Sequence, residues 1–595
     1  MEPDGPVDYY CGFQSFISFW KLLKYLYPRW EYAIALTSIL FIVAGSNEVI
    51  AYHSGTVVGK FYKALVEHNE NQFWTVFYQA SLIYIGQTLV VALISLCSWL
   101  LAVSLRRNLV SGLHRLYFQR HVYYNINTIH GEGIDNPDQR ITQDAEKMTT
   151  LLATKILPYF IIAPGVIAYY TVKTWEQAGW IGVVCIYGYF LIGTVVNRVI
   201  VSPITKWTAR LERAEGDFRY KHVSVRNNSE ESAFYEAHNF EQNECNRFIG
   251  GLLFIQARLA VWKFPAQYFQ TFFDYYGGVL TYAVQVIPVF LLKSYSGYSP
   301  GDLAQQISNN AFFFMYLINS FTRLTDLAMS IGELAGYTQR LSSLIVFAQK
   351  CQKEEWSKAP FGNEKDIFKL DNISFASSSS DKKSLISNLS IDITALKTLL
   401  ITGASGVGKT SLFRVLKQLW DPSSGDIQRY LEVDQVMFLP QKPYLPVGNL
   451  SLKQQLFFPQ FTEDFDSSED SFILKMLDLL GLGKLVSLTG SLNDLSDFEW
   501  QDVLSPGEQQ RLSIARVLLQ KPRAVILDEA TSCLGEDVEK LVYELLKHSG
   551  IHYISIGHRS SLFALHDQEL HLKHTDTYVI RDIPHFDEKS VHSRQ

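Results

Sequence analysis

The chain has 595 residues, of which 47% are hydrophobic and 19% charged, and its formal net charge is −6. This length predicts at least two domains, and a net acidic chain without a stripe of lysine and arginine excludes nucleic acid as an expected partner. The six cysteines contain no C-x-x-C pair, so neither a disulfide framework nor a zinc site is indicated. Charged residues are scarce between residues 32 and 332 and frequent after residue 350, which predicts a membrane half followed by a soluble half.

Residues 1–30 predict an amphipathic helix that lies in the interface of the bilayer. Apolar residues recur at near-helical spacing from Phe13 to Leu26, and Lys21 and Lys24 can extend toward the lipid headgroups. The segment lacks the basic start and the small-residue cleavage site of a signal peptide. We therefore expect a surface helix ahead of the first span.

Six mainly apolar windows follow, and a bilayer needs roughly 20 residues per helix. They cover residues 32–52, 77–103, 156–172, 180–196, 272–292 and 310–331. Only a short turn separates the third window from the fourth, which predicts a helical hairpin. We expect residues 31–345 to form a six-span membrane domain and residues 346–365 to form a linker.

The two long loops of the membrane half carry most of its lysine and arginine, one after the second span and one after the fourth. Positively charged loops stay in the cytosol, so the soluble half is expected there too. Recurring apolar residues predict that both loops are helical extensions of the spans. Two stretches, residues 136–140 and 229–236, are either solvated turns and helix starts or docking helices that transmit force to the soluble half.

Charged residues within the predicted spans are candidates for a substrate pathway. They are Glu48, Asp274, Arg323 and Asp326, and Tyr169 and Tyr170 are aromatic candidates for the same pocket. Because charge is costly in hydrocarbon, these groups should face the interior of the bundle or a water-filled cavity. Arg323 and Asp326 lie three residues apart and either neutralise each other or contact substrate.

The soluble half, residues 366–595, is organised around a phosphate-binding loop and ends in a polar tail. The loop consists of Gly403, Ala404, Ser405, Gly406, Val407, Gly408, Lys409 and Thr410, between an apolar strand and a helix. The glycines let backbone N–H groups point into one concavity, Lys409 can reach the terminal phosphates, and the Thr410 hydroxyl can ligate Mg²⁺. The pattern predicts an α/β domain that binds a nucleotide.

Two carboxylates follow a buried strand at residues 524–527. ATP hydrolysis needs a metal ligand and a group that orients or deprotonates water, and adjacent carboxylates at the end of a strand supply both. We assign Asp528 to the shell of the Mg²⁺ and Glu529 to the attacking water. A second strand, residues 436–439, ends just before Gln441.

Together with the segments at residues 504–511 and 554–559, these motifs resemble the ATP-binding cassette (ABC) family over nearly the whole chain. The resemblance implies an α-helical six-span membrane domain of the exporter type, followed by an α/β nucleotide-binding domain. It implies that Gln441 senses Mg²⁺ and water, that His558 contacts the γ-phosphate, and that Ser505 and Gly507 cap nucleotide held by a second copy. With one cassette, the chain is expected to be a half-transporter that acts as a homodimer.

Residues 136–140, the preceding Tyr123-Tyr124 and residues 229–235 resemble subfamily D, whose best-known members import fatty acyl-CoA into peroxisomes. Residues 188–197, 216–222 and 504–508 are most similar to the branch that transports lysosomal cobalamin. The resemblance implies cobalamin export from the lysosome and another multi-pass lysosomal membrane protein as a partner. Three alternatives stay open: a peroxisomal acyl-CoA importer, a location in the endoplasmic reticulum, and a regulator or chaperone that uses ATP without transport.

Three positions depart from the family pattern. Where a tyrosine normally stacks on adenine, only Phe375 is a nearby aromatic residue, so Phe375 is the candidate to bind the adenine. Pro506 replaces a glycine, and Gly535 stands where an aspartate is usual. We expect hydrolysis to survive these changes, and adenine to contribute less than the phosphates to binding.

Overall fold

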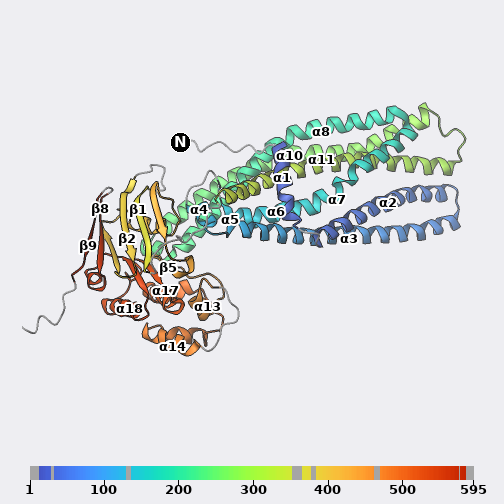
Figure 1. Ribbon diagram of the computed structural model, residues 1–595. Helices are drawn as coiled ribbons and strands as arrows, with labels where there is room; N and C mark the ends of the chain where they lie inside the picture. Colours follow the sequence, from blue (N-terminus) through green and yellow to red (C-terminus); the bar gives the residue numbers. More distant parts are fainter. Residues whose placement is uncertain are drawn as a thin grey trace, which may run out of the picture. The chain divides into compact units, whose positions relative to one another are not determined.

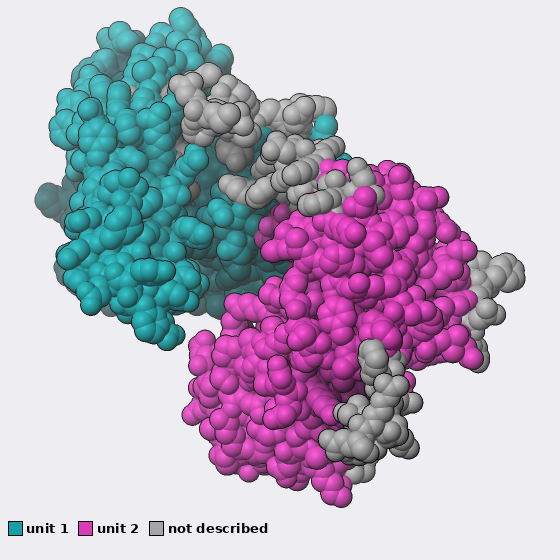
Figure 2. All heavy atoms as spheres, turned by 90° about the vertical axis from the view of Figure 1, so that its left-hand side faces the viewer, with its two compact units in different colours: residues 1–119, 132–350 teal, residues 120–131, 351–595 magenta. Residues whose placement is uncertain are grey.

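The computed structural model describes residues 13–28, 32–128, 134, 136–351, 365–376, 384–460, 469–574 and 577–584 (Figure 1). The chain forms two compact units, which Figure 2 colours separately. The first contains residues 1–119 and 132–350, and the second contains residues 120–131 and 351–595. A short piece of the first long loop therefore belongs to the second unit.

The first unit is helical, with five helices of more than 30 residues (α2, α3, α8, α10 and α11) and several short ones. They are α1 (Phe13–Leu26), α2 (Tyr32–Val66), α3 (Glu70–Tyr117), α5 (Pro137–Gln139), η1 (Arg140–Asp144), α6 (Ala145–Leu151), η2 (Leu152–Ile156), α7 (Leu157–Phe160), α8 (Ile162–Asn227), α9 (Ser229–Phe234), α10 (His238–Val284), η3 (Ile287–Leu291) and α11 (Pro300–Lys350). In Figure 1, α2 lies alongside α3, and α8, α10 and α11 run together. The great length of α3, α8 and α10 confirms that the loops are helical extensions.

Each predicted apolar window falls on helical segments of this unit. Among the described residues, three helical stretches are long and apolar enough to cross a membrane: Tyr32–Val66, Glu70–Tyr117 and Pro137–Val196. The total of six spans stays a prediction.

The hairpin between the third and fourth windows is confirmed. Gly179 has φ +65° inside α8, a conformation that interrupts a helix. The Thr171 and Tyr187 hydroxyls are 3.0 Å apart, whereas a continuous helix would separate residues at this spacing by about 24 Å. The chain therefore reverses at Gly179.

The second unit contains two sheets. The smaller is antiparallel with the order β2-β1-β4, formed by β1 (Asp366–Ala376), β2 (Ser384–Thr394) and β4 (Ser424–Arg429). The larger has the order β5-β6-β7-β3-β8-β9, formed by β5 (Val436–Leu439), β6 (Ala524–Asp528), β7 (His552–Ile556), β3 (Leu399–Gly403), β8 (Gln568–His574) and β9 (Thr577–Asp582). All of its pairings are parallel except that of β8 with β9. Every residue of β3, β6 and β7 is buried, which explains their continuous apolar runs.

Helices surround these sheets. They are α4 (Val122–Thr128), α12 (Lys409–Leu416), η4 (Val433–Gln435), α13 (Leu452–Phe457), α14 (Asp470–Leu479), α15 (Lys484–Thr489), α16 (Trp500–Val503), α17 (Pro506–Gln520), α18 (Glu536–His548) and η6 (Ser560–Leu565). Because β3, β5, β6 and β7 are parallel, their carboxyl ends meet at one edge of the sheet. The loop after β3, the carboxylates after β6 and the polar residues after β5 and β7 are thus brought together.

Candidate nucleotide-binding and hydrolysis site

The loop between β3 and α12 forms the expected cradle. Gly403, Gly406 and Gly408 have φ of +141°, +80° and +108°, conformations that favour glycine. A Cβ on Gly403 would lie 2.3 Å from the Leu572 carbonyl oxygen, so a side chain cannot fit at that position. The loop therefore keeps its backbone free to approach phosphate oxygens.

Lys409 lies inside this cradle. Its side chain is buried, and Nζ donates hydrogen bonds to the Gly403 and Ala404 carbonyl oxygens, both at 2.9 Å. Burial lowers the pKa of Lys409, while the negative charges of Glu529 and Asp528 oppose that shift. The two hydrogen bonds thus orient the Lys409 amine before nucleotide binds. The negative charge of a bound phosphate would stabilise its protonated form, which burial disfavours.

Oxygen ligands suited to Mg²⁺ meet beside the lysine. The Thr410 hydroxyl donates to Asp528 Oδ1 at 3.2 Å, and Asp528 is 7% exposed. Burial raises the pKa of Asp528, and the hydrogen bond from Thr410 opposes this shift. A hydroxyl and a carboxylate at one point form a hard donor set that fits Mg²⁺.

Two residues that follow two neighbouring strands, β5 and β7, meet around the second carboxylate, which follows β6. Gln441 Nε2 donates to Glu529 Oε2 at 3.0 Å, and His558 Nε2 lies 3.5 Å from Glu529 Oε1. Glu529 has φ +49°, an uncommon conformation for a residue with a side chain, and its N–H donates to the Ile556 carbonyl oxygen at 3.1 Å. The backbone thus turns the carboxylate toward the amide and the imidazole.

Ser505 caps the amino terminus of α17. The Glu508 N–H donates to Ser505 Oγ at 3.4 Å, and Glu508 Oε2 accepts from the Ser505 N–H at 3.0 Å and from its hydroxyl at 2.8 Å. Burial alone would raise the pKa of Glu508. Its ion pair with Lys484 at 2.5 Å and the bonds from Ser505 instead lower the pKa to about 2.

The proline in this segment is compatible with the helix. Pro506 occupies the first helical position, where an N–H would have no partner within the helix, so no helical hydrogen bond is lost. Within the described residues of this chain, no hydrogen bond joins Ser505 or Gly507 to residues 403–410. The structure therefore assembles Lys409, Thr410, Gln441, Asp528, Glu529 and His558 in one site and leaves Ser505 and Gly507 outside it.

The expectation for Phe375 is wrong. Its side chain is 1% exposed because it lies on the inner face of the smaller sheet, where it pairs with Ile386 across β1 and β2. A ring without an exposed face cannot stack on adenine. Alternating burial along β1 explains why this aromatic side chain points into the core.

A buried carboxylate that sequence reasoning missed joins two loops of the site. Glu539 in α18 is 1% exposed. Oε1 accepts a hydrogen bond from Thr531 at 2.6 Å, and Oε2 accepts one from Ser561 at 2.7 Å. Arg559 Nη1 lies 3.7 Å from Glu539 Oε1. Glu539 therefore connects the segment after Glu529 with the segment after His558.

Arg559 extends this connection. It donates to the Leu534 carbonyl oxygen at 2.7 Å and to the Ser532 carbonyl oxygen at 2.6 Å. The same segment contacts α17, because the Cys533 N–H donates to Gln510 Oε1 at 2.9 Å. A signal for Glu539 was present in the sequence, since its spacing of three, four and seven residues to Val542, Tyr543 and Leu546 places it on the buried face of α18.

A segment of the first long loop, helix α4, packs within the second unit. Trp420 Nε1 donates to the Tyr124 hydroxyl at 3.1 Å, and Val122 of the same helix α4 is 1% exposed. Residues 136–140, for which either a turn or a docking helix was expected, belong to the first unit, and their docking role stays a prediction. There Arg140 donates to the Arg340 carbonyl oxygen at 2.9 Å and to Ser343 Oγ at 2.7 Å. The second expected stretch contains Phe234, which is 80% exposed, so its role stays a prediction.

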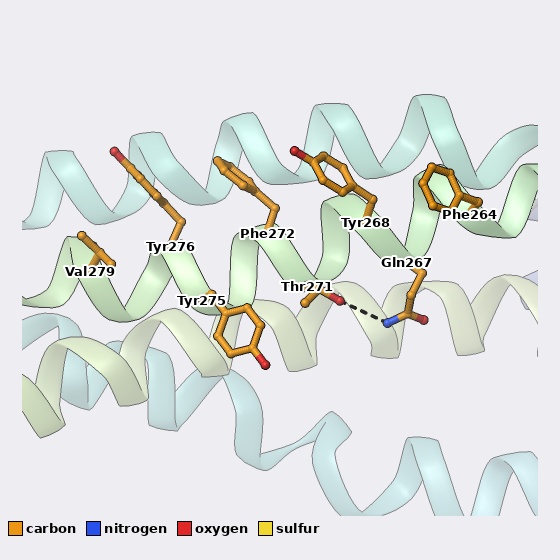
Figure 3. A pocket seen from close by; sticks show the side chains of 8 residues that line it. All are labelled: Phe264, Gln267, Tyr268, Thr271, Phe272, Tyr275, Tyr276 and Val279. Carbon is orange, nitrogen blue, oxygen red and sulfur yellow. Dashed lines mark hydrogen bonds between the residues drawn. The ribbon is translucent and has the colours of Figure 1, made fainter.

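A row of aromatic side chains follows one face of α10 in the first unit (Figure 3). Phe272 and Tyr276 are stacked with centroids 5.3 Å apart and planes 12° apart, and Tyr268 lies 6.5 Å from Phe272. Gln267 donates to Thr271 at 3.2 Å on an adjacent face. All residues of this row lie on α10 and most of them are exposed, so the row is an apolar surface of one helix.

Comparisons with known proteins agree with this geometry. The model of ABC transporter transmembrane region 2 matches residues 22–290, and the ABC transporter model matches residues 386–532. The chain is 37% identical to the lysosomal cobalamin transporter ABCD4 of Homo sapiens over 93% of this chain and 94% of that protein. It is 27% identical to ABC transporter D family member 1 of Dictyostelium discoideum over 96% and 90%, and 26% identical to human ATP-binding cassette sub-family D member 3 over 81% and 76%.

Proposed function

Because this chain belongs to the ABC transporter family, in subfamily D, we propose that it is an ATP-hydrolysing half-transporter that works as a homodimer and moves cobalamin from the lysosomal lumen to the cytosol. One observation supports ATP hydrolysis by this chain. Lys409, Thr410 and Asp528 form a phosphate and metal cradle, directly beside a carboxylate held by Gln441 and His558. The choice of cobalamin rests on the name of the relative with 37% identity.

The chain's own residues divide the hydrolytic work. Lys409 and the backbone of residues 403–408 bind the phosphates, while Thr410 and Asp528 would hold the metal. Bound Mg²⁺ supplies charge neutralisation between the phosphates. Glu529 orients and deprotonates the attacking water, His558 contacts the γ-phosphate, and Gln441 links the occupied site to the rest of the domain.

The proposed dimer is supported by the position of Ser505 relative to the phosphate-binding loop. Ser505 caps a helix of 15 residues whose amino terminus favours an anion. Since it makes no hydrogen bond to residues 403–410 of its own chain among the described residues, we place it over nucleotide bound by a second copy. Two copies related by a two-fold axis would then form two composite sites.

Docking helices couple hydrolysis to transport in this account. Tyr124 of α4 is bonded to Trp420 of the nucleotide-binding unit, so movement of that unit displaces the first long loop. The membrane helices continue directly from this loop. ATP-driven closure would thereby expose the substrate pathway alternately to the two sides of the membrane.

Uptake by proteoliposomes loaded with ATP tests the proposal, because molecules whose nucleotide-binding unit faces the vesicle interior then move substrate inward. Cobalamin and a long-chain acyl-CoA are offered separately to the unaltered protein and to Glu529→Gln, which keeps the size of the side chain but removes the base. We expect ATP-dependent cobalamin uptake that the variant loses. Acyl-CoA transport without cobalamin transport would place the chain with the peroxisomal importers, and ATPase activity without transport of either would make it a regulator.

A further inference from the structure

The proposed function places the amino terminus of α17 over the nucleotide of a second copy, and a carboxylate of the same chain already lies there. Glu508 Oε2 accepts hydrogen bonds from the Ser505 N–H at 3.0 Å and from the Ser505 hydroxyl at 2.8 Å. The side chain of Glu508 is 8% exposed. Because a hydroxyl has a single hydrogen, Ser505 must release Glu508 before it can donate to a phosphate oxygen.

This exchange has an electrostatic cost. The γ-phosphate and the Glu508 carboxylate would both lie next to the Ser505 hydroxyl, and like charges at such short range repel each other. Glu508 is also shielded from water, so the loss of one of its hydrogen bonds is not fully replaced by solvent. A cation that stays on Glu508 during the exchange reduces both costs.

Lys484 supplies that cation. Its Nζ lies 2.5 Å from Glu508 Oε1, whereas both hydrogen bonds from Ser505 go to Oε2. When the Ser505 hydroxyl turns toward a phosphate, the ion pair on Oε1 and the N–H bond on Oε2 can therefore remain. The side chain of Lys484 is 67% exposed, so solvent screens the pair and limits its strength.

The turn before Lys484 is fixed to the same helix. Arg511 of α17 donates to the Leu480 carbonyl oxygen at 2.9 Å and to the Gly481 carbonyl oxygen at 3.3 Å. Gly481 has φ +65°, and a Cβ there would lie 2.7 Å from Arg511 Nη1. Arg511 Nε also donates to the Gly507 carbonyl oxygen at 3.3 Å. One arginine thus joins the first turn of α17 to the turn that leads into α15, where Lys484 is the first residue.

We propose that Lys484 is a positioning residue for nucleotide capping: it neutralises Glu508, so that Ser505 can exchange its hydrogen bond to Glu508 for one to the γ-phosphate held by a second copy. This role rests on the proposed function and deepens it, because it exists only where Ser505 acts on the nucleotide of another copy. Lys484 of one copy should therefore affect the site that contains Lys409 of the other copy.

Mixed dimers of the full-length protein test this consequence. Two differently tagged copies are purified together, both with Glu529→Gln so that bound ATP is retained. One copy also carries Lys409→Ala, which leaves one nucleotide site, and Lys484→Met is placed on either copy. The measured quantity is the ATP concentration at which occlusion in the remaining site is half-maximal.

The remaining site combines Lys409 of one copy with Ser505 of the copy that carries Lys409→Ala. We expect the half-maximal ATP concentration to rise about threefold to tenfold when Lys484→Met is on that same copy, because the exchange at Ser505 then leaves Glu508 without its cation. It should stay within about twofold when the two substitutions are on different copies. A folding defect caused by Lys484→Met would give the opposite pattern, since it would impair the cradle of its own copy.

Two further variants complete the test. Lys475→Met is the matched control, because Lys475 is an exposed lysine of α14 that forms no ion pair with any residue the structure describes. Glu508→Gln, added to the copy that carries Lys484→Met, should return the half-maximal concentration to within about twofold, since glutamine can still accept from Ser505 and carries no charge. Failure of this rescue would show that Lys484 does not act through Glu508.

The outcomes separate this role from the proposed function. If Ser505→Arg weakens occlusion in the same arrangement but Lys484→Met matches Lys475→Met, the proposed dimer stands and Lys484 has no positioning role. An increase when Lys484→Met and Lys409→Ala are on different copies would likewise overturn the role. If Ser505→Arg also has no effect, or if no dimer occludes ATP, the proposed composite site fails together with it.

Discussion

Replacing Glu539 should slow ATP hydrolysis without weakening ATP binding. Within the part of the chain that the structure describes, this carboxylate has no hydrogen bond to the phosphate-binding loop, but it accepts hydrogen bonds from Thr531 and Ser561, which follow Glu529 and His558. Glutamine retains one oxygen acceptor and the shape of the side chain, so Glu539→Gln removes chiefly the charge. We therefore predict a change in the positions of Glu529 and His558 rather than a loss of the site.

The magnitude follows from the contacts. Hydrogen bonds to charged groups contribute about 1.5–3 kcal/mol and neutral ones about 0.5–1.5 kcal/mol, so Glu539→Gln should cost about 1–2 kcal/mol. If this cost falls on the transition state, kcat decreases roughly fivefold to thirtyfold. Glu539→Ala leaves the buried Thr531 hydroxyl and the half-buried Ser561 hydroxyl without this acceptor and should cost about 1–3 kcal/mol of stability for the buried group alone, which makes it the less informative variant.

The assay compares kcat for ATP hydrolysis, the Kd for ATP and the urea midpoint of the same protein preparations. Glu536→Gln is the matched control, because it makes the same change in the first turn of α18 at an exposed position. We expect a lower kcat with a Kd within about twofold for Glu539→Gln, and no change for the control. A normal kcat in Glu539→Gln would refute a positioning role. So would a decrease in kcat that is fully explained by the fraction of unfolded protein in the preparation.

Three further predictions concern other parts of the second unit. Tyr124→Phe removes the hydroxyl that accepts a hydrogen bond from Trp420 Nε1, so the amount of cobalamin transported per ATP hydrolysed should fall at least twofold while ATPase activity persists. Tyr123→Phe serves as the control. An equal ratio of transport to hydrolysis in both variants would show that this hydrogen bond does not couple the two processes. Burial lowers the pKa of His566 from its ordinary 6.5 to about 4, so the folded state favours the neutral ring. The contribution of this group to the free energy of unfolding is therefore fully present above pH 6.5 and should be lost at about 1.4 kcal/mol per pH unit as the pH falls toward 4. Hydrogen exchange of β7 and η6 at pH 7 and pH 4.5 measures this loss, and unchanged protection would contradict it. Because Phe375 is buried, GTP should compete with ATP to within about threefold, and a preference above about thirtyfold would reveal an adenine contact elsewhere.

The catalytic edge of the sheet could be predicted from sequence because strand ends converge. Lys409, Asp528, Glu529 and His558 each follow a short apolar run, and parallel strands place their carboxyl ends at one edge. Such residues are recognised by their local sequence context. No knowledge of distant contacts is needed to group them.

Contacts between residues far apart in the sequence could not be predicted in this way. Tyr124 and Trp420 are 296 positions apart, and nothing in either sequence context indicates the other. Phe375 failed for a different reason, since the position of an aromatic residue does not reveal which face of its strand is buried.

Mixed dimers test the central claim, that Ser505 completes the nucleotide site of a second copy. Two differently tagged copies are purified together, carrying Lys409→Ala and Ser505→Arg either on the same copy or on different copies, and the occluded nucleotide is counted. Composite sites predict that the dimer with the substitutions on different copies keeps one intact site, and that the dimer with both on one copy keeps none. The reverse pattern, with one intact site when both substitutions share a copy, would show that each chain builds its site alone and would contradict the account.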